Sequence, residues 1–421
     1  MKIKTKQMDY SDVLKLKTAS HKNPRKPSKA LKLLIKVISE GDLKKVNFKE
    51  EKVGMEKLEP GTPCLILMNH SCFLDLEIVS HLMYPNPYNI VMTTDGFVGK
   101  DALMRMIGCI PTQKFVTDMV LVKDMKYALE KLKSSVLLFP EASYSFDGTA
   151  TPLPESLGKC IKLLGVPVVM IKTEGAYARD PLYNMLQTRK VDVSAKMTYL
   201  FSPEKIATMT AQEINEILTE QFSFDNFKWQ QDNKVRIDEG FRADGLNRVL
   251  YKCPHCGSEG KMIGKGTFLE CRECKDKYEL DEYGYLKPLT GERLFRHIPD
   301  WYRWERECVR DEIEKGLYKL NIPVKIGMMV DRKAIYMVGD GNLIHDNSGF
   351  TLSGCNGKLS YHQKPGASYS LYSDYYWYEI GDVICIGDNR TSYYCFPNIE
   401  GDVVAKTRLA AEELYKFTRK K

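Results

Sequence analysis

Between residues 46 and 222, short apolar runs alternate with stretches that have the periodicity of a helix, and this alternation limits the folds open to the chain. The apolar runs cover residues 64–69, 89–94, 134–140, 166–172 and 191–201, and the helical patterns cover residues 124–133, 155–164 and 210–222. Strands separated by helices form parallel sheets, because each helix carries the chain back to the starting edge. The sequence therefore predicts an α/β domain with a mostly parallel sheet over residues 46–222.

The rest of the chain divides by composition into four further segments. Residues 1–45 form a basic N-terminal arm, residues 223–250 are polar and irregular enough for a linker, and residues 251–290 contain paired cysteines. Beyond a helical pattern near residue 300, short apolar runs alternate with turn residues, which indicates an antiparallel barrel or sandwich. We therefore expect a small β-rich domain with a C-terminal helix over residues 291–421.

The N-terminal arm contains an amphipathic helix pattern. Residues 1–39 carry eleven Lys or Arg against two Asp, whereas the whole chain has a net charge of +7. Ser28 can cap a helix with Lys29, Lys32 and Lys36 on one narrow face and apolar residues over the rest. Such a helix is typical of a membrane surface, although a helix packed on the core with its lysines exposed has the same pattern. The sequence leaves both interpretations open.

Two C-x-x-C pairs, Cys253 with Cys256 and Cys271 with Cys274, lie fourteen residues apart. Four thiolates on such a hairpin can reach tetrahedral positions around a metal ion, so a zinc ribbon with a structural zinc is expected. Disulfides or idle thiols are the alternatives. Because the N-terminus lacks the apolar segment of a secretory signal, we expect a cytoplasmic protein, and disulfides are rare in that compartment. His255, inside the first pair, is not expected to bind the metal.

A histidine and a carboxylate interrupt the first buried run and the helical pattern after it. His70 follows the apolar run 64–69, and Asp75 comes five residues later. If the strand ends at Asn69 and a helix capped by Ser71 follows, the two side chains occupy the positions that touch in a hydrophobic staple. The spacing can therefore place an imidazole against a carboxylate at the carboxyl edge of the sheet, where α/β folds build their sites. A structural histidine at a helix start is the alternative.

Four short stretches carry a family pattern: NHSCFLD at 69–75, GCIPTQK at 108–114, FPEASYS at 139–145 and VPVVMI at 166–171. In this order they resemble the sequence blocks of the lysophosphatidate acyltransferase family of glycerolipid acyltransferases, over residues 45–220. Ala142, Ser143 and Tyr144 stand where that family usually has Gly, Thr and Arg, and Lys114 replaces the usual Arg of the second block. The resemblance implies acyl transfer more firmly than it implies a lysophosphatidate acceptor.

The resemblance implies a role for each matching residue. His70 is the expected catalytic base, and Asp75 is the group that orients it. The residues expected to bind the acceptor substrate are Lys114, Glu141, Ser143 and Tyr144. A histidine suits the base because its imidazole titrates near neutral pH, and no enzyme nucleophile is needed when the hydroxyl of the acceptor attacks the thioester.

We therefore expect an enzyme that moves a fatty acyl group from acyl-CoA or acyl carrier protein to the hydroxyl of a lysophospholipid acceptor in phospholipid biosynthesis. It is expected to bind peripherally to an anionic membrane, on the cytosolic face. The alternative is a catalytically inactive lipid-binding or adaptor protein that retains the fold; intact His70 and Asp75 favour the enzyme. Nucleic acid is not an expected partner, because residues 251–280 carry nearly equal numbers of basic and acidic side chains.

Overall fold

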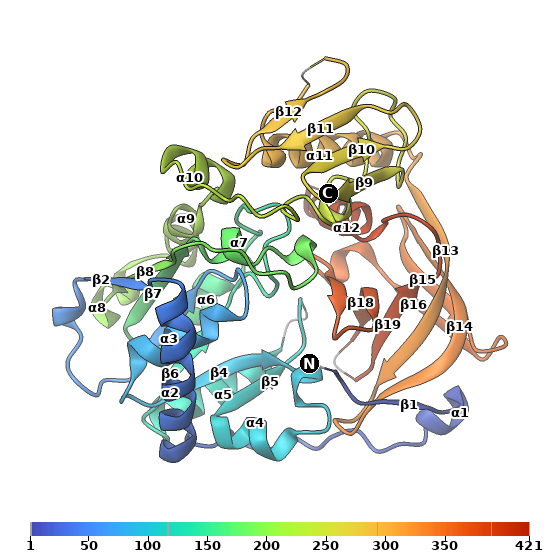
Figure 1. Cartoon of the computed structure of the whole chain (residues 1–421). Helices are drawn as coiled ribbons and strands as arrows, with labels where there is room; N and C mark the ends of the chain where they lie inside the picture. The colour runs from blue at the N-terminus through green and yellow to red at the C-terminus, as the bar shows by residue number, and fades with distance from the viewer. Residues whose placement is uncertain (1, 116–117, 293, 389, 421) are drawn as a thin grey trace.

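The computed structural model describes residues 2–115, 118–292, 294–388 and 390–420. Its strands form three sheets, of seven, eight and four strands. Figure 1 shows the seven-stranded sheet and its helices on the left of the molecule, the eight-stranded sheet curving down the right side, and the four-stranded sheet at the top. Val98 and Phe115, beside the seven-stranded sheet, share a core with Trp377 and Tyr394 of the eight-stranded sheet, so the two larger sheets are joined by packing.

The seven-stranded sheet has the order β2-β8-β7-β3-β6-β4-β5. Its strands are β2 (Lys49–Val53), β3 (Leu65–Met68), β4 (Tyr88–Thr93), β5 (Cys109–Thr112), β6 (Ser135–Leu138), β7 (Val168–Glu174) and β8 (Ser194–Phe201). Its helices are α3 (Leu74–Met83), α4 (Asp101–Ile107), α5 (Met119–Glu130), α6 (Leu157–Leu164), α7 (Ala176–Arg179), α8 (Pro203–Thr208) and α9 (Ala211–Phe222). Every pairing is parallel except β7 with β8. The predicted α/β domain with a mostly parallel sheet is confirmed.

Strand β3 lies in the middle of this sheet and is completely buried. Ile66 and Met68 pack on one face, in a core that includes α3, whereas Leu65 and Leu67 pack on the other, in a core that includes α5, α6 and α9. Successive side chains of a strand point to opposite faces, so a continuous apolar run is what a doubly covered strand requires. The burial holds the end of β3, and the residues that follow it, in a fixed position.

Residues 223–250 do not form the exposed linker that their polar composition suggests. They contain α10 (Asn226–Asp232) and η4 (Leu246–Arg248). Their few apolar side chains, including Phe227, Leu246 and Val249, are buried in the largest hydrophobic core of the protein. The segment is therefore packed against its neighbours, because burial of these side chains offsets the cost of ordering the chain.

The four-stranded sheet has the order β12-β11-β10-β9 and packs on α11 (Ile298–Glu314). Its strands are β9 (Met262–Lys265), β10 (Phe268–Cys271), β11 (Lys277–Leu280) and β12 (Leu286–Pro288). The ring of Tyr278 meets the indole of Trp301 edge-on at 5.1 Å, and the indole nitrogen donates to the carbonyl of Lys252 at 3.0 Å. The small sheet is therefore held to the C-terminal part of the chain by side-chain packing.

The C-terminal region is β-rich and ends in a helix, as the sequence predicts. Its elements are β13 (Lys319–Met329), β14 (Ile335–Asp346), β15 (Gly349–Gly354), β16 (Leu359–Gln363), η5 (Pro365–Ala367), β17 (Tyr372–Trp377), β18 (Gly381–Gly387), β19 (Ser392–Pro397) and α12 (Val404–Lys420). The described strands form one open sheet, with β16 and β17 at its ends, and neither a barrel nor a sandwich. Helix α12 replaces a second sheet, because its buried residues Ala405, Leu409 and Leu414 cover the apolar face.

The N-terminal arm is bound to both large sheets. Strand β1 (Thr5–Gln7) adds to β14 in parallel, and α1 (Tyr10–Val13) buries Val13 in the same core as α12. Helix α2 (Lys29–Lys45) then packs on α3. Its orientation does not match a helix packed on the core with its lysines exposed, because Lys32 and Lys36 are half-buried against the α/β domain, whereas the apolar stripe of the helix is exposed.

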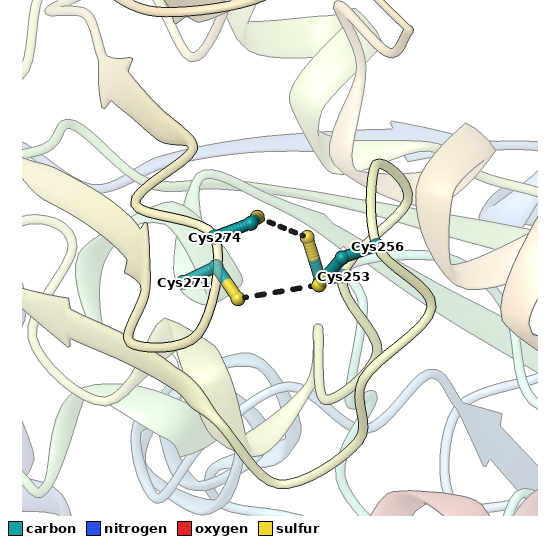
Figure 2. A group of neighbouring side chains, drawn as sticks. All are labelled: Cys253, Cys256, Cys271 and Cys274. Carbon is teal, nitrogen blue, oxygen red and sulfur yellow. Dashed lines mark hydrogen bonds between the residues drawn. The ribbon is translucent and has the colours of Figure 1, made fainter.

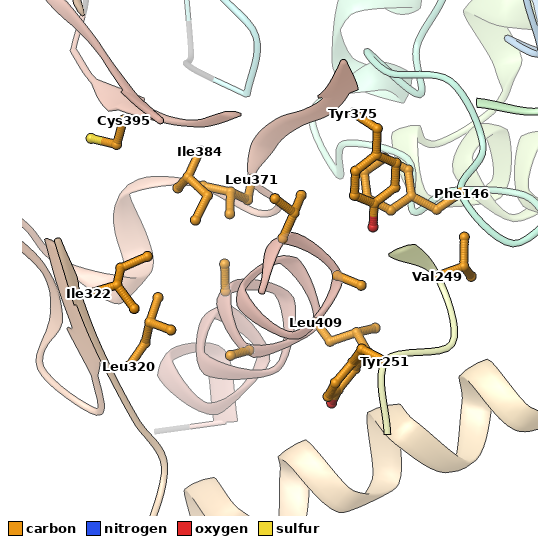
Figure 3. Close-up of a cluster of buried hydrophobic side chains, with 14 of the residues drawn as sticks. Phe146, Val249, Tyr251, Leu320, Ile322, Leu371, Tyr375, Ile384, Cys395 and Leu409 are labelled. Atoms are coloured by element: carbon orange, nitrogen blue, oxygen red, sulfur yellow. The ribbon is translucent and has the colours of Figure 1, made fainter. Parts of the chain in front are cut away.

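A single core joins α12 to the α/β domain. Figure 3 shows the buried side chains that surround α12, with Phe146 and Tyr375 in contact beside it. Their ring centroids lie 4.8 Å apart, and Phe146 belongs to the loop that follows β6. The loop after β6 is therefore packed directly against the C-terminal region.

Replacing Leu409 by Ala should lower the free energy of unfolding by about 2–5 kcal/mol, because the change removes apolar contacts and leaves a cavity. Leu409 is fully buried, whereas Leu34 on α2 is 53% exposed. The matched control Leu34→Ala should change the free energy by less than about 0.5 kcal/mol. Denaturant unfolding followed by tryptophan fluorescence measures both values, and equal losses would contradict the packing of α12.

Candidate active site

Asn69 fixes the turn that leads out of β3. Its amide oxygen accepts a hydrogen bond from the backbone N–H of Thr173 at 2.8 Å, and its amide nitrogen donates to the Thr173 carbonyl at 3.3 Å. Thr173 lies on the neighbouring strand β7, and Asn69 is fully buried. This pair of bonds continues the sheet beyond the last residue of β3 and positions His70 at its carboxyl edge.

His70 and Asp75 make the contact that their spacing predicts. The Nδ1 atom of His70 lies 3.0 Å from Oδ2 of Asp75, and the same oxygen accepts hydrogen bonds from the backbone N–H groups of Ser71 at 2.7 Å and Cys72 at 3.2 Å. A carboxylate can only accept hydrogen bonds, so Nδ1 carries the ring proton and donates it to Asp75. The lone pair of His70 Nε2 is therefore left to accept a proton from a substrate.

The helix after His70 begins later than predicted. It starts at Leu74, with Phe73 before it and no side-chain cap, so Ser71 is not the N-cap. Asp75 takes over that task from inside the helix, because its carboxylate accepts the two backbone N–H groups that precede the first turn. The same Asp75 oxygen therefore accepts hydrogen bonds from the backbone at the start of the helix and from the imidazole of His70.

The imidazole of His70 lies between two aromatic rings and is only 18% exposed. The ring of Phe139 stacks on it at a centroid distance of 4.0 Å, and the ring of Tyr144 is tilted against it at 4.3 Å. Burial lowers the pKa of His70, although the hydrogen bond and charge of Asp75 act in the opposite direction. A lowered pKa keeps the imidazole neutral near pH 7, which is the form that can act as a base.

Glu141 holds the loop after β6 against the histidine. One carboxylate oxygen accepts from the backbone N–H of His70 at 3.2 Å, and the other accepts from the backbone N–H of Thr151 at 2.7 Å. Glu141 is fully buried, and burial raises its pKa to about 7. Both of its carboxylate oxygens accept hydrogen bonds from the backbone of the protein. Glu141 therefore positions this loop, in addition to the role in binding the acceptor that the resemblance implies.

The third block has a left-handed backbone conformation at Ala142, the position where the family usually has glycine. Ala142 has φ of 57°, in the left-handed region that glycine adopts without strain. Ser143 accepts a hydrogen bond from the guanidinium of Arg408 at 3.1 Å, and that guanidinium lies 4.1 Å from the ring centroid of Phe146. Arg408 belongs to α12, and no motif in the sequence connects it with the third block.

Lys114, the basic residue of the second block, lies beyond β5. Its Nζ lies 4.1 Å above the ring of Tyr372, which belongs to the C-terminal sheet. Burial lowers the pKa of Lys114, while the carboxylates of Asp374 and Asp95 act against that shift. The structure thus brings His70, Asp75, Glu141 and Tyr144 together and places Lys114 nearby, at the boundary with the C-terminal sheet.

The four predicted cysteines converge at one end of the small sheet. Figure 2 shows their side chains pointing toward a common centre, with Cys253 Sγ 3.6 Å from Cys274 Sγ and Cys256 Sγ 3.8 Å from Cys271 Sγ. All four sulfur atoms lie within 4.8 Å of one another. Tetrahedral zinc with Zn–S bonds of about 2.3 Å requires sulfur atoms about 3.8 Å apart, so this set of ligands fits zinc. His255 is exposed and lies outside the group.

Comparisons with known proteins agree with this site. The family model described as Acyltransferase matches residues 49–172, a segment that contains all four sequence blocks. Among solved structures, the chain is similar to the 1-acyl-sn-glycerophosphate (LPA) acyltransferase PlsC from Thermotoga maritima, with 16% sequence identity and a TM-score of 0.37 over 45% of this chain and 76% of that one. No curated protein sequence matches the chain. Residues 49–172 therefore contain an acyltransferase-family domain, in the part of the chain where the four lysophosphatidate-acyltransferase-like blocks predict it.

Proposed function

We propose that this protein is a glycerolipid O-acyltransferase of phospholipid biosynthesis. It would move a fatty acyl group from acyl-CoA or acyl carrier protein to the hydroxyl of a lysophospholipid acceptor. The observation that carries the proposal is the buried pair of His70 and Asp75 at the carboxyl edge of an acyltransferase-family domain. The lysophosphatidate-like acceptor and the identity of the donor rest on the sequence resemblance.

The geometry of the pair suits a direct transfer between the two substrates. The acceptor oxygen attacks the carbonyl carbon of the thioester while Nε2 of His70 takes the hydroxyl proton. The carbon–sulfur bond then breaks, and the leaving thiolate takes that proton from the imidazolium. Asp75 holds the imidazole in the tautomer that leaves Nε2 unprotonated, and its charge stabilises the imidazolium between the two proton transfers.

Replacing His70 by Ala should lower turnover by roughly 10²–10⁴, the usual contribution of a positioned general base. Asp75→Asn should also lower turnover by roughly 10² or more, since the amide loses the charge and can favour the wrong tautomer. The double variant should resemble His70→Ala, because the pair acts as a unit. Turnover of a lysolipid with a labelled acyl donor measures these changes.

The control for these variants is His362→Ala, which removes an exposed histidine of the C-terminal sheet and should leave turnover unchanged. The pH profile gives a second test, because the Asp75 carboxylate raises the pKa of His70. Without that carboxylate the histidine stays neutral to lower pH, so the acidic limb of kcat/KM should move to lower pH in Asp75→Asn. Folded single variants that turn over like the parent would favour a non-catalytic lipid-binding protein.

We propose that the protein binds the cytosolic face of an anionic membrane through the apolar stripe of α2. Leu33, Leu34, Val37 and Ile38 are 48%, 53%, 62% and 59% exposed and lie on one face of the helix. Lys32 faces the protein, where its Nζ donates to the carbonyl of Asn86 at 2.7 Å. No helix of the described residues is long and apolar enough to cross a membrane. The proposed contact is mainly apolar, because the exposed side chains of the stripe would enter the lipid.

Changing Leu34 and Val37 together to Ser should weaken binding to vesicles of anionic phospholipid by about tenfold or more, because two exposed apolar side chains no longer enter the lipid. The matched control is Leu163→Ser, which changes an apolar residue that is 52% exposed on α6. Cosedimentation with vesicles measures binding. Equal binding of the double variant and the control would show that the stripe of α2 does not contact lipid.

We propose that Cys253, Cys256, Cys271 and Cys274 bind one structural zinc and make the small sheet a zinc ribbon. The sulfur–sulfur distances of 3.6 and 3.8 Å, too long for a disulfide and suited to a shared metal, support the proposal. Cys253 and Cys271 are buried in the same core as α11 and α12. Metal binding would therefore stabilise more of the chain than the ribbon alone.

Purified protein should contain close to one zinc per chain, and Cys271→Ser should lose it. The near-ultraviolet circular dichroism of the packed pair Tyr278 and Trp301 should decrease when a chelator removes the metal, since the ribbon would no longer hold its ring contacts. Cys308→Ser, at a half-buried cysteine outside the cluster, is the control and should retain the metal. Metal analysis that finds no zinc in the parent would refute the site.

A further inference from the structure

A cleft separates the carboxyl ends of β4 and β5 from the curved C-terminal sheet. Its cavity volume is about 50 Å³, which is room for several hydroxyl-sized groups at about 10–15 Å³ each, and it opens to solvent. The α/β domain contributes Thr93, Asp95 and Lys114, and the C-terminal sheet contributes Tyr372, Ser392 and Tyr394. We call this space the interdomain cleft. None of the four family blocks accounts for its C-terminal half.

Two charged groups of the cleft have atoms without a hydrogen-bond partner among the described residues. Asp95 is 1% exposed; the hydroxyl of Tyr372 donates to its Oδ2, whereas Oδ1 has no partner among the described residues. The Nζ of Lys114 lies over the ring of Tyr372, and no described residue accepts a hydrogen bond from it. A buried polar group without a partner is costly, so these two groups are suited to a polar ligand.

The charges of the cleft do not suit a dianionic phosphate. Lys114 interacts with the carboxylates of Asp95 and Asp374 and with the guanidinium of Arg408, which is itself paired with Glu412 at 3.2 Å, so carboxylates oppose both positive charges. A phosphate monoester bound at Lys114 would come close to Asp95 and be repelled by it. The third block also lacks the family's arginine, because Tyr144 stands in that position. The cleft therefore offers one donor group, one acceptor group and several hydroxyls, without a surplus of positive charge.

The cleft lies about as far from His70 as the head group of a lysolipid extends from its reacting hydroxyl. His70 follows β3, and Asp95 follows β4, with β6 between the two strands. Neighbouring strands are about 4.8 Å apart, so the two strand ends are separated by about 10 Å. A lysolipid whose reacting hydroxyl is at His70 can therefore extend its head group along the edge of the sheet and into the cleft.

We propose that the interdomain cleft binds the head group of the acceptor, and that this head group is a polyol, such as a glycerol or cyclitol ring, without a terminal phosphate. This inference deepens the proposed function by naming the class of acceptor. Asp95 accepts a hydrogen bond from one hydroxyl of the polyol, and Lys114 donates to another. A site built around such hydrogen bonds rejects molecules that leave its polar groups unpaired.

The C-terminal sheet then has a role in specificity. Tyr372 orients Asp95 through its hydroxyl, and that hydroxyl accepts a hydrogen bond from the indole of Trp377 at 2.9 Å. Both aromatic residues belong to β17, at the edge of the curved sheet. The sheet therefore positions an acceptor-binding carboxylate of the α/β domain, in addition to forming the opposite wall of the cleft.

Binding of soluble head groups tests the proposal without requiring turnover. Glycerophosphoinositol and glycerophosphoglycerol should bind the full-length protein at least tenfold more tightly than glycerol 3-phosphate, measured by saturation-transfer NMR titration. Asp95→Asn should weaken binding of the two polyols by about tenfold, and the isosteric change Thr93→Val should weaken it by about threefold. Both variants are checked for folding by thermal unfolding. Tighter binding of glycerol 3-phosphate would overturn the proposal.

The matched control is Asp374→Asn. Asp374 interacts with the charge of Lys114 but does not line the cleft. Binding that changes equally in Asp95→Asn and Asp374→Asn would show a general charge effect and would contradict direct hydrogen bonding by Asp95. The expected change for Asp374→Asn is less than about twofold.

Measuring the acylation of different lysolipids distinguishes a failure of this inference from a failure of the proposed function. Lysophosphatidylinositol and lysophosphatidylglycerol should be acylated with a kcat/KM at least tenfold above that of lysophosphatidate. Transfer that prefers lysophosphatidate would overturn the polyol proposal and leave the acyltransferase proposal intact. Polyol binding without transfer to any acceptor would overturn the acyltransferase proposal and leave the cleft assignment intact.

Discussion

Complete burial of β3 is the constraint on which the candidate active site is built. Leu65–Met68 is covered on both faces of the sheet, so polar groups can enter the chain only where the strand ends. Asn69 continues the sheet through its side chain, and His70 follows at the edge. Asp75 then satisfies two backbone N–H groups and the imidazole with one oxygen. The contact between His70 and Asp75 thus follows from the need to satisfy polar groups at the end of a buried strand.

The third block shows how the C-terminal region becomes part of this site. The family's arginine is absent from the block, yet a guanidinium lies beside it, because Arg408 of α12 donates to Ser143. The Nη1 atom of Arg408 has no hydrogen-bond partner among the described residues, although the residue is only 3% exposed. Phe146, in the same loop, packs against Tyr375. The loop that carries Glu141 is therefore held by the C-terminal region as well as by His70 of the α/β domain.

Features that depend on neighbours in the sequence could be predicted, whereas those that depend on distant segments could not. The helix within residues 210–222 and the contact of His70 with Asp75 follow from local patterns, and both are present. The mostly parallel sheet follows from the alternation of strands and helices. By contrast, nothing local to Arg408 indicates its contact with Ser143, 265 residues earlier. The open C-terminal sheet also escaped prediction, because the helix that covers its face comes after the last strand.

The position of the small cysteine-containing sheet connects it to the site through α12. Lys406, near the start of that helix, pairs with Glu259 of the ribbon at 2.7 Å, and Glu259 also pairs with Lys252 at 3.1 Å. These partly buried charges are desolvated together, so loss of one partner would leave the others unpaired at a high cost. Lys406 precedes Arg408 by two residues, and Arg408 contacts the third-block loop through Ser143. A metal bound by the four cysteines would therefore also fix the end of α12 from which the guanidinium of Arg408 reaches the loop of the candidate active site. The proposed zinc would then affect that site without touching the substrate.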